Sequence, residues 1–442
     1  MLRKVKKVAL ASLGCKVNQY DATALANLFE KRGYKIVNFS EEADIYVINT
    51  CTVTHLADRK SRQLIRRAKR KNPVSLVVVT GCYAQVSPEE VKSIPEVDVV
   101  AGTYDLAQIV DLVEKHKGEA PIKTKYNLVR RFNCVQAYEE LPVLSLPERT
   151  RAYVKIQEGC NNICTYCIIP YARGPLRSRQ PEKVLGEVAS LTQKGFKEIV
   201  LTGIHIGAYG QDLGSQINLT TLLSFLTKIP TLKRLRLSSI EPQDVNSTLI
   251  EFVATQPKIC RHLHIPLQSG DNEILRSMGR RYNISEYRDL VNLIREQING
   301  VALATDLIVG FPGETEQQFK NTYLFIQEMA FSRLHVFKYS PRPGTLAATF
   351  PNQVKESVKK DRSELLISLG KELAHSFALQ HIGHEVNVLV EEEAAGFYPG
   401  CLKGLTGNYL TAIFPGSIEL RGHIVKVKVK EVENNLLKGM II

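Results

Sequence analysis

Three short apolar runs near the start of the chain each end at a cysteine. VALASLGC ends at Cys15, DIYVINTC at Cys51 and LVVVTGC at Cys82. Cys51 follows Cys15 by 36 residues and Cys82 follows Cys51 by 31, and each interval is about one strand–helix–strand unit. Because parallel strands end at one edge of a sheet, the pattern predicts that the three thiols converge there. Three small cysteines buried under loops would be the structural alternative.

Alternating strand and helix patterns predict an α/β protein of several domains. In residues 1–117 the pattern indicates a doubly wound parallel sheet, with strands at Val5–Leu10, Asp44–Ile48, Leu76–Val79 and Val97–Val100 and helices at Asp21–Arg32, Asp58–Lys71 and Tyr104–Lys117. Residues 118–145 are predicted to be a linker. Residues 146–374 hold six further strand signals, which fit a partial (β/α)6 barrel with its ligands at the strand carboxyl ends.

The chain changes character after a long predicted helix at Asp361–His381. Val386, Val388 and Val390 alternate with other residues, and Val425–Val429 alternates valine with lysine. Alternation of this kind is typical of half-buried antiparallel strands. Residues 375–442 are therefore predicted to form a small all-β, OB-like barrel.

A second cysteine motif follows the predicted strand Tyr153–Ile156. Cys160, Cys164 and Cys167 have the spacing C-x-x-x-C-x-x-C. Three thiolates on one loop can hold three irons of a four-iron cluster and leave the fourth open to a ligand. A structural zinc site is less favoured, because such sites usually have four ligands and no fourth cysteine or histidine lies nearby. Cys134, Cys260 and Cys401 have no partners at useful spacing and are expected to be ordinary thiols.

The chain is basic, with 58 Lys and Arg against 45 Asp and Glu, a net charge of +13. Eight positive charges fall within 13 positions of the predicted helix 58–71, and this is a candidate phosphate-binding surface. They are Arg59, Lys60, Arg62, Arg66, Arg67, Lys69, Arg70 and Lys71. The region after His384 has six basic and seven acidic residues, so its only basic stripe is Lys426, Lys428 and Lys430, which a solvated sheet face would also explain.

The beginning of the chain resembles a lipoprotein signal, with basic residues before an apolar run and Gly14-Cys15. The uncharged stretch Val8–Leu13 is six residues, which is shorter than the ~7–15 of a signal peptide. No segment approaches the ~20 apolar residues of a membrane span. A cytoplasmic protein without membrane attachment, in which thiols stay reduced, is expected.

Together these motifs resemble the methylthiotransferase branch of the radical S-adenosylmethionine (SAM) superfamily. The resemblance rests on the three-cysteine loop with Pro170 and RGPLRSR, on HIPLQSG (264–270), on TDLIVGFPGET (305–315) and on YSPRPGT (339–345). It covers nearly the whole chain and implies an RNA-binding TRAM domain at the C-terminus. LTGIHIGAYGQD (201–212) is similar to the group that modifies N6-threonylcarbamoyladenosine beside the tRNA anticodon.

The resemblance implies two [4Fe–4S] clusters, one on Cys15, Cys51 and Cys82 and one on the Cys160 loop, where SAM binds. It implies transfer of a methylthio group to the adenine C2 carbon of tRNA, with two SAM molecules consumed and a one-electron reductant such as flavodoxin or ferredoxin. The sulfur donor is unknown. Alternatives are isopentenyladenosine in tRNA, a ribosomal-protein aspartate, or a non-catalytic RNA-binding iron–sulfur protein.

The resemblance places SAM contacts at strand ends. Gly310 and Gly313 allow close backbone approach to a ligand, although a strand-to-helix turn would use the same glycines. Gly203 and Glu241 are similarly placed. No side chain is expected to act as a general acid or base, since the cofactor supplies the difficult step. His205 and His264 line the cavity or are satisfied core histidines.

Overall fold

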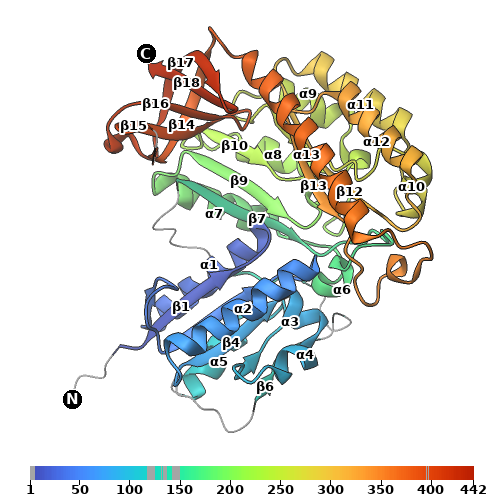
Figure 1. The fold of residues 1–442 in the computed structure, drawn as a ribbon. Helices are drawn as coiled ribbons and strands as arrows, with labels where there is room; N and C mark the ends of the chain where they lie inside the picture. Colours follow the sequence, from blue (N-terminus) through green and yellow to red (C-terminus); the bar gives the residue numbers. More distant parts are fainter. Residues whose placement is uncertain are drawn as a thin grey trace. The chain divides into compact units, whose positions relative to one another are not determined.

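The computed structural model describes residues 5–116, 125–130, 132, 137–141, 150–394, 396 and 398–442 (Figure 1). The chain folds as two compact units. The first comprises residues 1–147, 155–179 and 340–345, and the second comprises 148–154, 180–339 and 346–442. Both units are therefore assembled from segments that are not contiguous in sequence.

The first unit is built on a parallel sheet with the strand order β2-β1-β3-β4-β5-β6. Its elements are β1 (Lys7–Ser12), α1 (Lys16–Lys31), β2 (Lys35–Val37), β3 (Ile45–Thr50), α2 (His55–Lys71), β4 (Leu76–Gly81), α3 (Cys82–Val86), α4 (Pro88–Ser93), β5 (Val99–Val100), α5 (Ala107–Lys115) and β6 (Tyr126–Asn127). The unit also holds the second half of β7 (Arg151–Glu158), α6 (Ile169–Arg173) and β8 (Arg177–Ser178).

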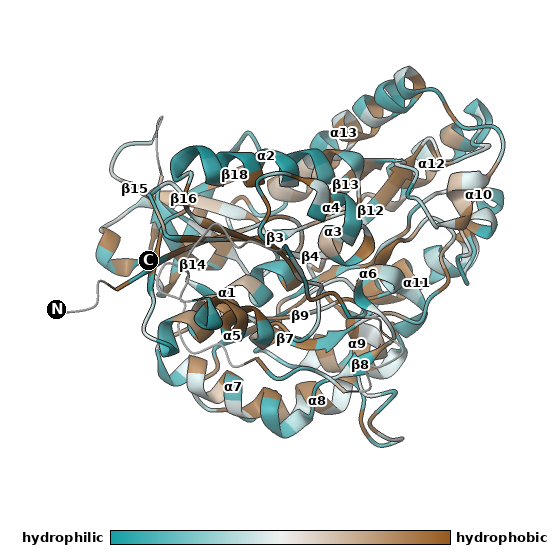
Figure 2. Ribbon diagram, turned by 90° about the horizontal axis from the view of Figure 1, so that it is seen from below, coloured by the Kyte–Doolittle hydropathy of each residue, from teal (hydrophilic) through white to brown (hydrophobic). Residues whose placement is uncertain are grey.

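Helices cover both faces of this sheet because its central strands are apolar on both sides. Every residue of β3 and β4 is buried. Alternate strand residues pack with Phe29 of α1 and Val113 of α5 in one core, and with Ile65 of α2 and Val91 of α4 in the other. Figure 2 shows the contrast between the apolar strands β3 and β4 and the hydrophilic helix α2. The predicted doubly wound α/β fold is confirmed.

The central part of the second unit repeats strand and helix. Its elements are α7 (Pro181–Gln193), β9 (Glu198–Gly203), α8 (Leu219–Leu226), β10 (Arg234–Leu237), α9 (Ser247–Thr255), β11 (His262–His264), α10 (Asn272–Ser277), α11 (Ile284–Gln297), β12 (Ala302–Val309), α12 (Glu316–Met329), β13 (Arg333–Lys338) and α13 (Glu356–Leu379), with short 3-10 turns at Ile206–Ala208, Pro242–Asp244 and Leu346–Thr349. The sheets have the orders β10-β9-β7-β8 and β11-β12-β13, and a parallel bridge from Leu235 to Ile259 continues from β10 toward β11. This is the predicted partial (β/α)6 barrel.

The C-terminal part is a closed barrel with the order β14-β15-β16-β18-β17. Its strands are β14 (Glu385–Glu393), β15 (Cys401–Thr406), β16 (Thr411–Pro415), β17 (Ile424–Glu433) and β18 (Leu436–Ile441), with a 3-10 turn at Ile418–Leu420. Val427 and Val429 are buried, whereas the alternating lysines of β17 are exposed. The predicted all-β barrel is confirmed. The period-two pattern arises because successive side chains of β17 point alternately into the core and into solvent.

Within the second unit, two arginines join the parallel strands to the C-terminal barrel. Arg234 and Arg236 both donate to the buried carboxylate of Glu198, at 2.5 and 2.8 Å. Arg236 also donates to the carbonyls of Thr406 and Gly407, each at 2.9 Å. The guanidinium of Arg236 lies 4.3 Å from the ring centroid of Tyr409. One buried carboxylate thus holds two cations that donate to backbone carbonyls of the barrel, Arg234 to Asn387 and Leu405 and Arg236 to Thr406 and Gly407.

Several element bounds differ from those the sequence pattern predicts. α1 begins at Lys16, five residues before the predicted Asp21, and its first turns bury Asn18 and Asp21 beside Val17 and Tyr20. β6 lies inside the predicted linker 118–145 and pairs with β5; residues 118–124, 131, 133–136 and 142–145 of that linker lie outside the described residues. α13 runs from Glu356 to Leu379, through the predicted boundary at 374/375. The other predicted domain limits stay predictions.

Candidate functional site

Cys15, Cys51 and Cys82 each directly follow, or lie just beyond, a strand of the first unit. The three strands are β1, β3 and β4, which are neighbours in the sheet and run in parallel. Cys15 caps α1, Cys51 follows β3, and Cys82 opens α3. The strand ends therefore bring the three cysteines to one edge, as the spacing predicts.

Close contacts show how tightly these strand ends approach one another. The thiols of Cys15 and Cys82 lie 3.9 and 4.0 Å from the same Oδ1 atom of Asn18. Gly14 has φ +98°, and a Cβ atom placed there would lie 2.9 Å from Cβ and 3.0 Å from Sγ of Cys51. Only glycine suits this position, since a side chain would both strain the backbone and push against the thiol.

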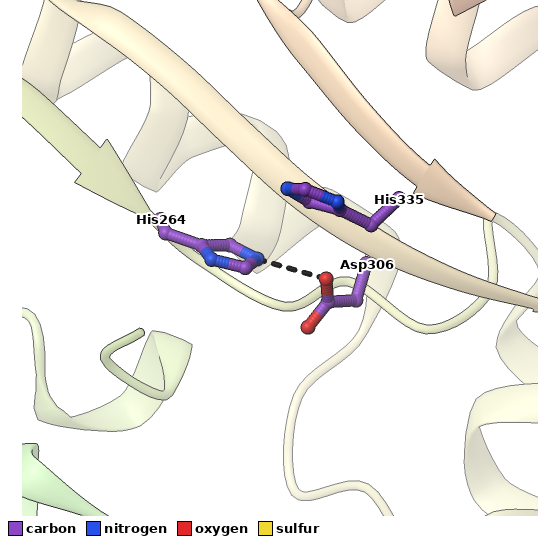
Figure 3. A group of neighbouring side chains, drawn as sticks. All are labelled: His264, Asp306 and His335. Atoms are coloured by element: carbon purple, nitrogen blue, oxygen red, sulfur yellow. Dashed lines mark hydrogen bonds and ion pairs between the residues drawn. The ribbon is translucent and has the colours of Figure 1, made fainter. Parts of the chain in front are cut away.

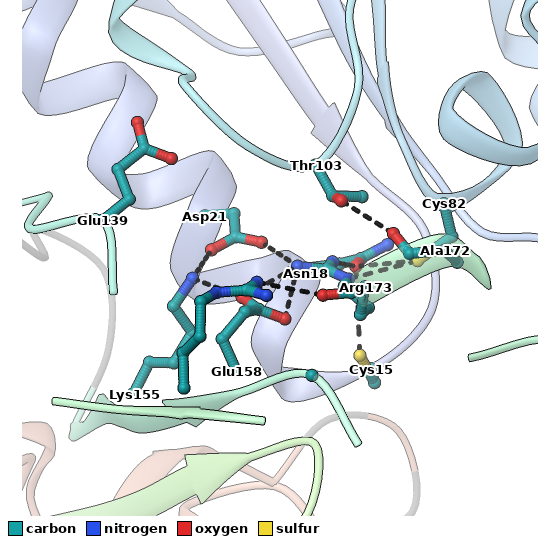
Figure 4. A network of polar contacts seen from close by, with 12 residues as sticks. Cys15, Asn18, Asp21, Cys82, Thr103, Glu139, Lys155, Glu158, Ala172 and Arg173 are labelled. Atoms are coloured by element: carbon teal, nitrogen blue, oxygen red, sulfur yellow. Dashed lines mark hydrogen bonds and ion pairs between the residues drawn. The ribbon is translucent and has the colours of Figure 1, made fainter. Parts of the chain in front are cut away.

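The amide of Asn18 holds two of the strand ends together. Its Nδ2 donates to the carbonyl of Leu13 at 2.7 Å and to that of Thr50 at 3.0 Å. These carbonyls precede Cys15 and Cys51, respectively, in the loops that carry them. One buried side chain therefore sets the separation of the β1 and β3 ends while its oxygen faces the thiols of Cys15 and Cys82 (Figure 4).

Two of the three thiols are deeply buried. Cys51 is 6% and Cys82 3% exposed, whereas Cys15 is exposed. Burial, and then the neighbouring Cys82, raises the pKa of the Cys51 thiol to about 12. Burial also raises the pKa of Cys82, although the cation of Arg173 opposes the shift. Because iron binds thiolates, loading a cluster here would release protons, and three converging soft ligands fit an iron–sulfur cluster.

A buried charge network lies beneath Cys82 (Figure 4). Arg173 is completely buried, and its Nε donates to Cys82 Sγ at 3.3 Å. Its Nη1 donates to Asp21 at 2.8 Å and to Glu158 at 3.2 Å. Lys155 donates to the same two carboxylates, at 2.5 and 2.9 Å. Two cations and two carboxylates balance one another, which is how buried charges are tolerated.

Cys160, Cys164 and Cys167 occupy the loop between β7 and α6, in the same unit. All three are partly buried. The Cys167 N–H donates to the Cys164 carbonyl at 3.0 Å, and the N–H of Asn162 approaches Cys160 Sγ at 3.4 Å. The Cys160 N–H donates to the carbonyl of Gly174 at 3.0 Å. A turn therefore joins Cys164 to Cys167, and the bond from Cys160 to Gly174 brings the two ends of this segment together.

The predicted SAM-contact residues all lie at strand carboxyl ends in the second unit. Gly203 is the last residue of β9, and Glu241 follows β10 and pairs with Arg280. Gly310 and Gly313 follow β12 and both have positive φ. The Gly310 N–H donates to Glu314 at 2.6 Å. The hydrogen bond between Gly310 and Glu314 stabilises this turn. Contact with SAM stays a prediction.

His264, Asp306 and His335 meet on β11, β12 and β13 (Figure 3). His264 Nε2 lies 2.9 Å from Asp306 Oδ1, and its Nδ1 lies 2.9 Å from Ser239 Oγ. Three such groups within 4.8 Å could share a cation. Both ring nitrogens of His264 have hydrogen-bond partners, so this histidine is satisfied within the protein. His205 is likewise bonded to Asp244, at 2.6 Å.

Three families match successive parts of the chain. Residues 7–102 match the uncharacterized protein family UPF0004, residues 154–326 the Radical SAM superfamily, and residues 380–442 the TRAM domain. The chain is 47% identical to threonylcarbamoyladenosine tRNA methylthiotransferase MtaB of Bacillus subtilis, over 96% of this chain and 93% of that protein. The corresponding protein of Aquifex aeolicus is 41% identical, over 96% and 100%.

The chain belongs to the radical SAM methylthiotransferase family. A tRNA-2-methylthio-N(6)-dimethylallyladenosine synthase of Pelotomaculum thermopropionicum is also similar, with 38% identity over 99% of this chain and 98% of that protein. Membership implies SAM and a [4Fe–4S] cluster as cofactors. In fold, the methylthiotransferase resembles the radical SAM methyltransferase TsrM of Kitasatospora setae, with a TM-score of 0.56 and 16% identity over 78% of this chain and 77% of that one.

The structure divides the eight basic residues of α2 into two groups. Arg62 bonds to Tyr83 and Glu90, Lys69 pairs with Asp98 at 3.1 Å, and Lys71 bonds to a backbone carbonyl. The remaining five are exposed: Arg59, Lys60, Arg66, Arg67 and Arg70. The outward face of α2 is therefore a narrower basic surface than the sequence predicts, and a role in RNA binding stays a prediction.

The C-terminal barrel of the methylthiotransferase carries paired charges. Lys426 lies 3.4 Å from Glu385, and Lys403 lies 2.9 Å from Glu392. Lys428 and Lys430 are exposed on β17.

Among the described helices, none is both long and apolar enough to cross a membrane.

Sequence reasoning missed the residues that support the first triad. Asn18, Asp21, Lys155, Glu158 and Arg173 had no predicted role. One signal was available: β7 reads as a buried strand, yet it carries Lys155 and Glu158, and charged residues in a buried strand require partners. Arg173 lies in the segment that carries the family resemblance. Of the other cysteines, Cys260 is buried, Cys401 is partly buried, and Cys134 lies outside the described residues.

Proposed function

We propose that this methylthiotransferase acts on tRNA and attaches a methylthio group to the C2 carbon of N6-threonylcarbamoyladenosine beside the anticodon. The proposal is supported first by the identity of 41–47% to enzymes named for that substrate, over nearly the whole chain. The TRAM domain supports RNA as the substrate class. A dimethylallyladenosine substrate is the second candidate, because a relative named for it is 38% identical.

The observation that carries the proposal is the presence of two thiol triads in one compact unit. Cys160, Cys164 and Cys167 would hold the cluster that binds SAM. Cys15, Cys51 and Cys82 would hold a second [4Fe–4S] cluster. With these groups bound, the cofactors supply the radical that removes the C2 hydrogen and the methylthio sulfur that replaces it.

The chain's own residues supply placement and charge. Asn18 fixes the ends of β1 and β3, so that Cys15 and Cys51 are held before any cluster binds. Gly310 and Gly313 shape the turn proposed to contact SAM. Glu314 accepts the Gly310 N–H and pairs with Arg362 at 2.7 Å, which makes that turn rigid.

We assign tRNA backbone binding to the outward face of α2. This helix begins four residues after Cys51, and its N-cap is Thr54, whose side chain accepts the Ala57 N–H. From Arg59 to Arg70 the exposed cations extend about 17 Å at 1.5 Å per residue. Such a row can follow several phosphates of an anticodon stem-loop. An anticodon-loop base is single-stranded, so presenting it requires little unpairing.

Nucleoside mass spectrometry tests the substrate. The tRNA of cells lacking this protein should lose 2-methylthio-N6-threonylcarbamoyladenosine and accumulate N6-threonylcarbamoyladenosine, and the gene returned on a plasmid should reverse both changes. The variant C160A should not restore the modification. Loss of the methylthio group from dimethylallyladenosine instead would select the second candidate, and unchanged tRNA would reject both. A cytoplasmic location and a flavodoxin- or ferredoxin-type reductant stay predictions.

A further inference from the structure

Arg173 makes two contacts that charge balance does not require, one with Asn18 and one with the sulfur of Cys82. Asp21 and Glu158 neutralise it together with Lys155, and all four groups are buried. Its Nε–H is directed elsewhere, to the sulfur of Cys82 at 3.3 Å. A neutral thiol is a weak acceptor, whereas a metal-bound thiolate is a good one. The contact is therefore strongest when Cys82 carries metal.

The guanidinium has no freedom to turn away from the sulfur. Its Nη1 is held by Asp21 and Glu158, and its Nη2 donates to Asn18 Oδ1. The side chain has no exposed surface. A planar fork held at both Nη atoms fixes the direction of the remaining Nε–H. Asn18, the residue that ties the β1 and β3 ends, is thus coupled to the same cation.

Hydrogen bonds to cluster sulfurs and nearby positive charge favour the reduced state of an iron–sulfur cluster, because reduction adds negative charge. Arg173 provides both at Cys82. We propose that Arg173 is a positioning residue for the Cys15/Cys51/Cys82 cluster. Arg173 orients the sulfur of Cys82 and raises the reduction potential of the cluster. This inference rests on the second cluster of the proposed function.

The same short segment also contacts the other triad. Gly174, the next residue, accepts the N–H of Cys160 at 3.0 Å. Glu158, a partner of Arg173, lies two residues before Cys160. One continuous segment, residues 158–174, therefore contains both the loop proposed to bind SAM and Arg173, which donates to Cys82. A displacement of that loop would be transmitted to the first triad through Arg173.

Redox titration of the whole reconstituted protein, followed by electron paramagnetic resonance, tests the assignment. SAM changes the signal of the cluster it binds, so the signal that SAM leaves unchanged reports the Cys15/Cys51/Cys82 cluster. In R173K the charge remains but the Nε–H is lost, and we expect the potential of this cluster to become more negative. The potential of the SAM-sensitive cluster should remain the same. K155R is the matched control. Lys155 belongs to the same network, but its described bonds go to Asp21 and Glu158 and to no cysteine.

A measurement on the wild-type chain covers the case in which R173K does not fold. Protein labelled with 15N-arginine should show a weak guanidinium nitrogen coupling on the SAM-insensitive signal in pulsed resonance spectra. No coupling, or an unchanged potential in folded R173K, would overturn the role of Arg173 and leave the proposed function intact. Iron for only one cluster in the wild type would overturn both the second cluster and this inference. A tRNA substrate different from the proposed one would affect neither measurement.

Discussion

Arg342 Nη1 lies 2.8 Å from a carboxylate oxygen of Asp58, and both side chains are almost completely buried. Arg342 also donates to the hydroxyl of Thr52 at 2.6 Å, and Thr52 donates to Asp58 at 2.7 Å. Asp58 is the only acidic residue of α2. Because it is neutralised from the inner side, the outer face of the helix carries positive charge that no carboxylate of that helix opposes.

Neutralising this outer face should weaken tRNA binding. In the triple variant R59Q/R66Q/R70Q three exposed cations are lost, and the slope of log K against log salt should fall in magnitude by about 2–3. Filter binding of tRNA at several salt concentrations measures this slope. The matched variant K428Q/K430Q removes exposed charges from β17. A slope reduced in the β17 variant and unchanged in the α2 variant would assign the RNA footprint to the barrel instead.

Each triad should account for about half of the bound iron. After anaerobic reconstitution, the triple variant C160A/C164A/C167A should keep about half of the iron and sulfide of the wild type, and C15A/C51A/C82A should keep the other half. Iron and acid-labile sulfide assays give the values. SAM should perturb the cluster signal only in the second of these variants. Complete loss of iron in either variant would contradict two independent sites.

The position of Gly14 against Cys51 gives a selective test of the first triad. G14A places a methyl group 2.9 Å from Cβ of Cys51, at a backbone φ of +98°. We expect loss of the iron held by Cys15, Cys51 and Cys82. Gly33 has a similar φ of +82° but nothing within 4 Å of an added Cβ. G33A should therefore lower stability by about 1 kcal/mol through backbone strain alone and retain full iron. Equal iron in the two variants would show that crowding at Cys51 has no effect.

Stability should depend on pH through Glu198. Burial acts to raise the pKa of this carboxyl, but Arg236 and Arg234 overcome burial and hold its pKa below the usual value. A group whose pKa is lowered by folding stabilises the folded state above its unfolded pKa, and that contribution disappears as pH falls through the folded pKa. E198Q should lose about 3–5 kcal/mol at pH 7, since two buried cations lose their partner. Thermal midpoints of wild type and variant should converge as the pH falls below the usual pKa of a glutamate; a difference that stays constant down to the most acidic pH at which both fold would assign the effect to packing.

The convergence of the first triad could be predicted because it depends on local pattern. Each cysteine terminates an apolar run, and the topology of parallel strands places such ends together. The start of α1 could not be predicted in the same way. Asn18 and Asp21 lie on its buried side beside Val17 and Tyr20, so two polar residues interrupt the apolar pattern where the helix begins.

The charge network beneath Cys82 could not be derived from the sequence pattern. Arg173 and Asp21 are 152 residues apart, and no periodicity links them. β6 has two residues, Tyr126 and Asn127, and is too short for an alternating pattern to identify. In both cases tertiary pairing, rather than local preference, decides the structure.

The discontinuous composition of the first unit has a consequence for biosynthesis. Asp21 and Cys15 leave the ribosome some 160 residues before Arg173, an interval of about 8–30 s at ordinary elongation rates. During that interval the sheet of β1–β5 can form before Lys155 and Arg173, the two cations that contact Asp21, have both been made. The nascent first triad is therefore an unfinished site, and stable insertion of its cluster should await the arrival of α6.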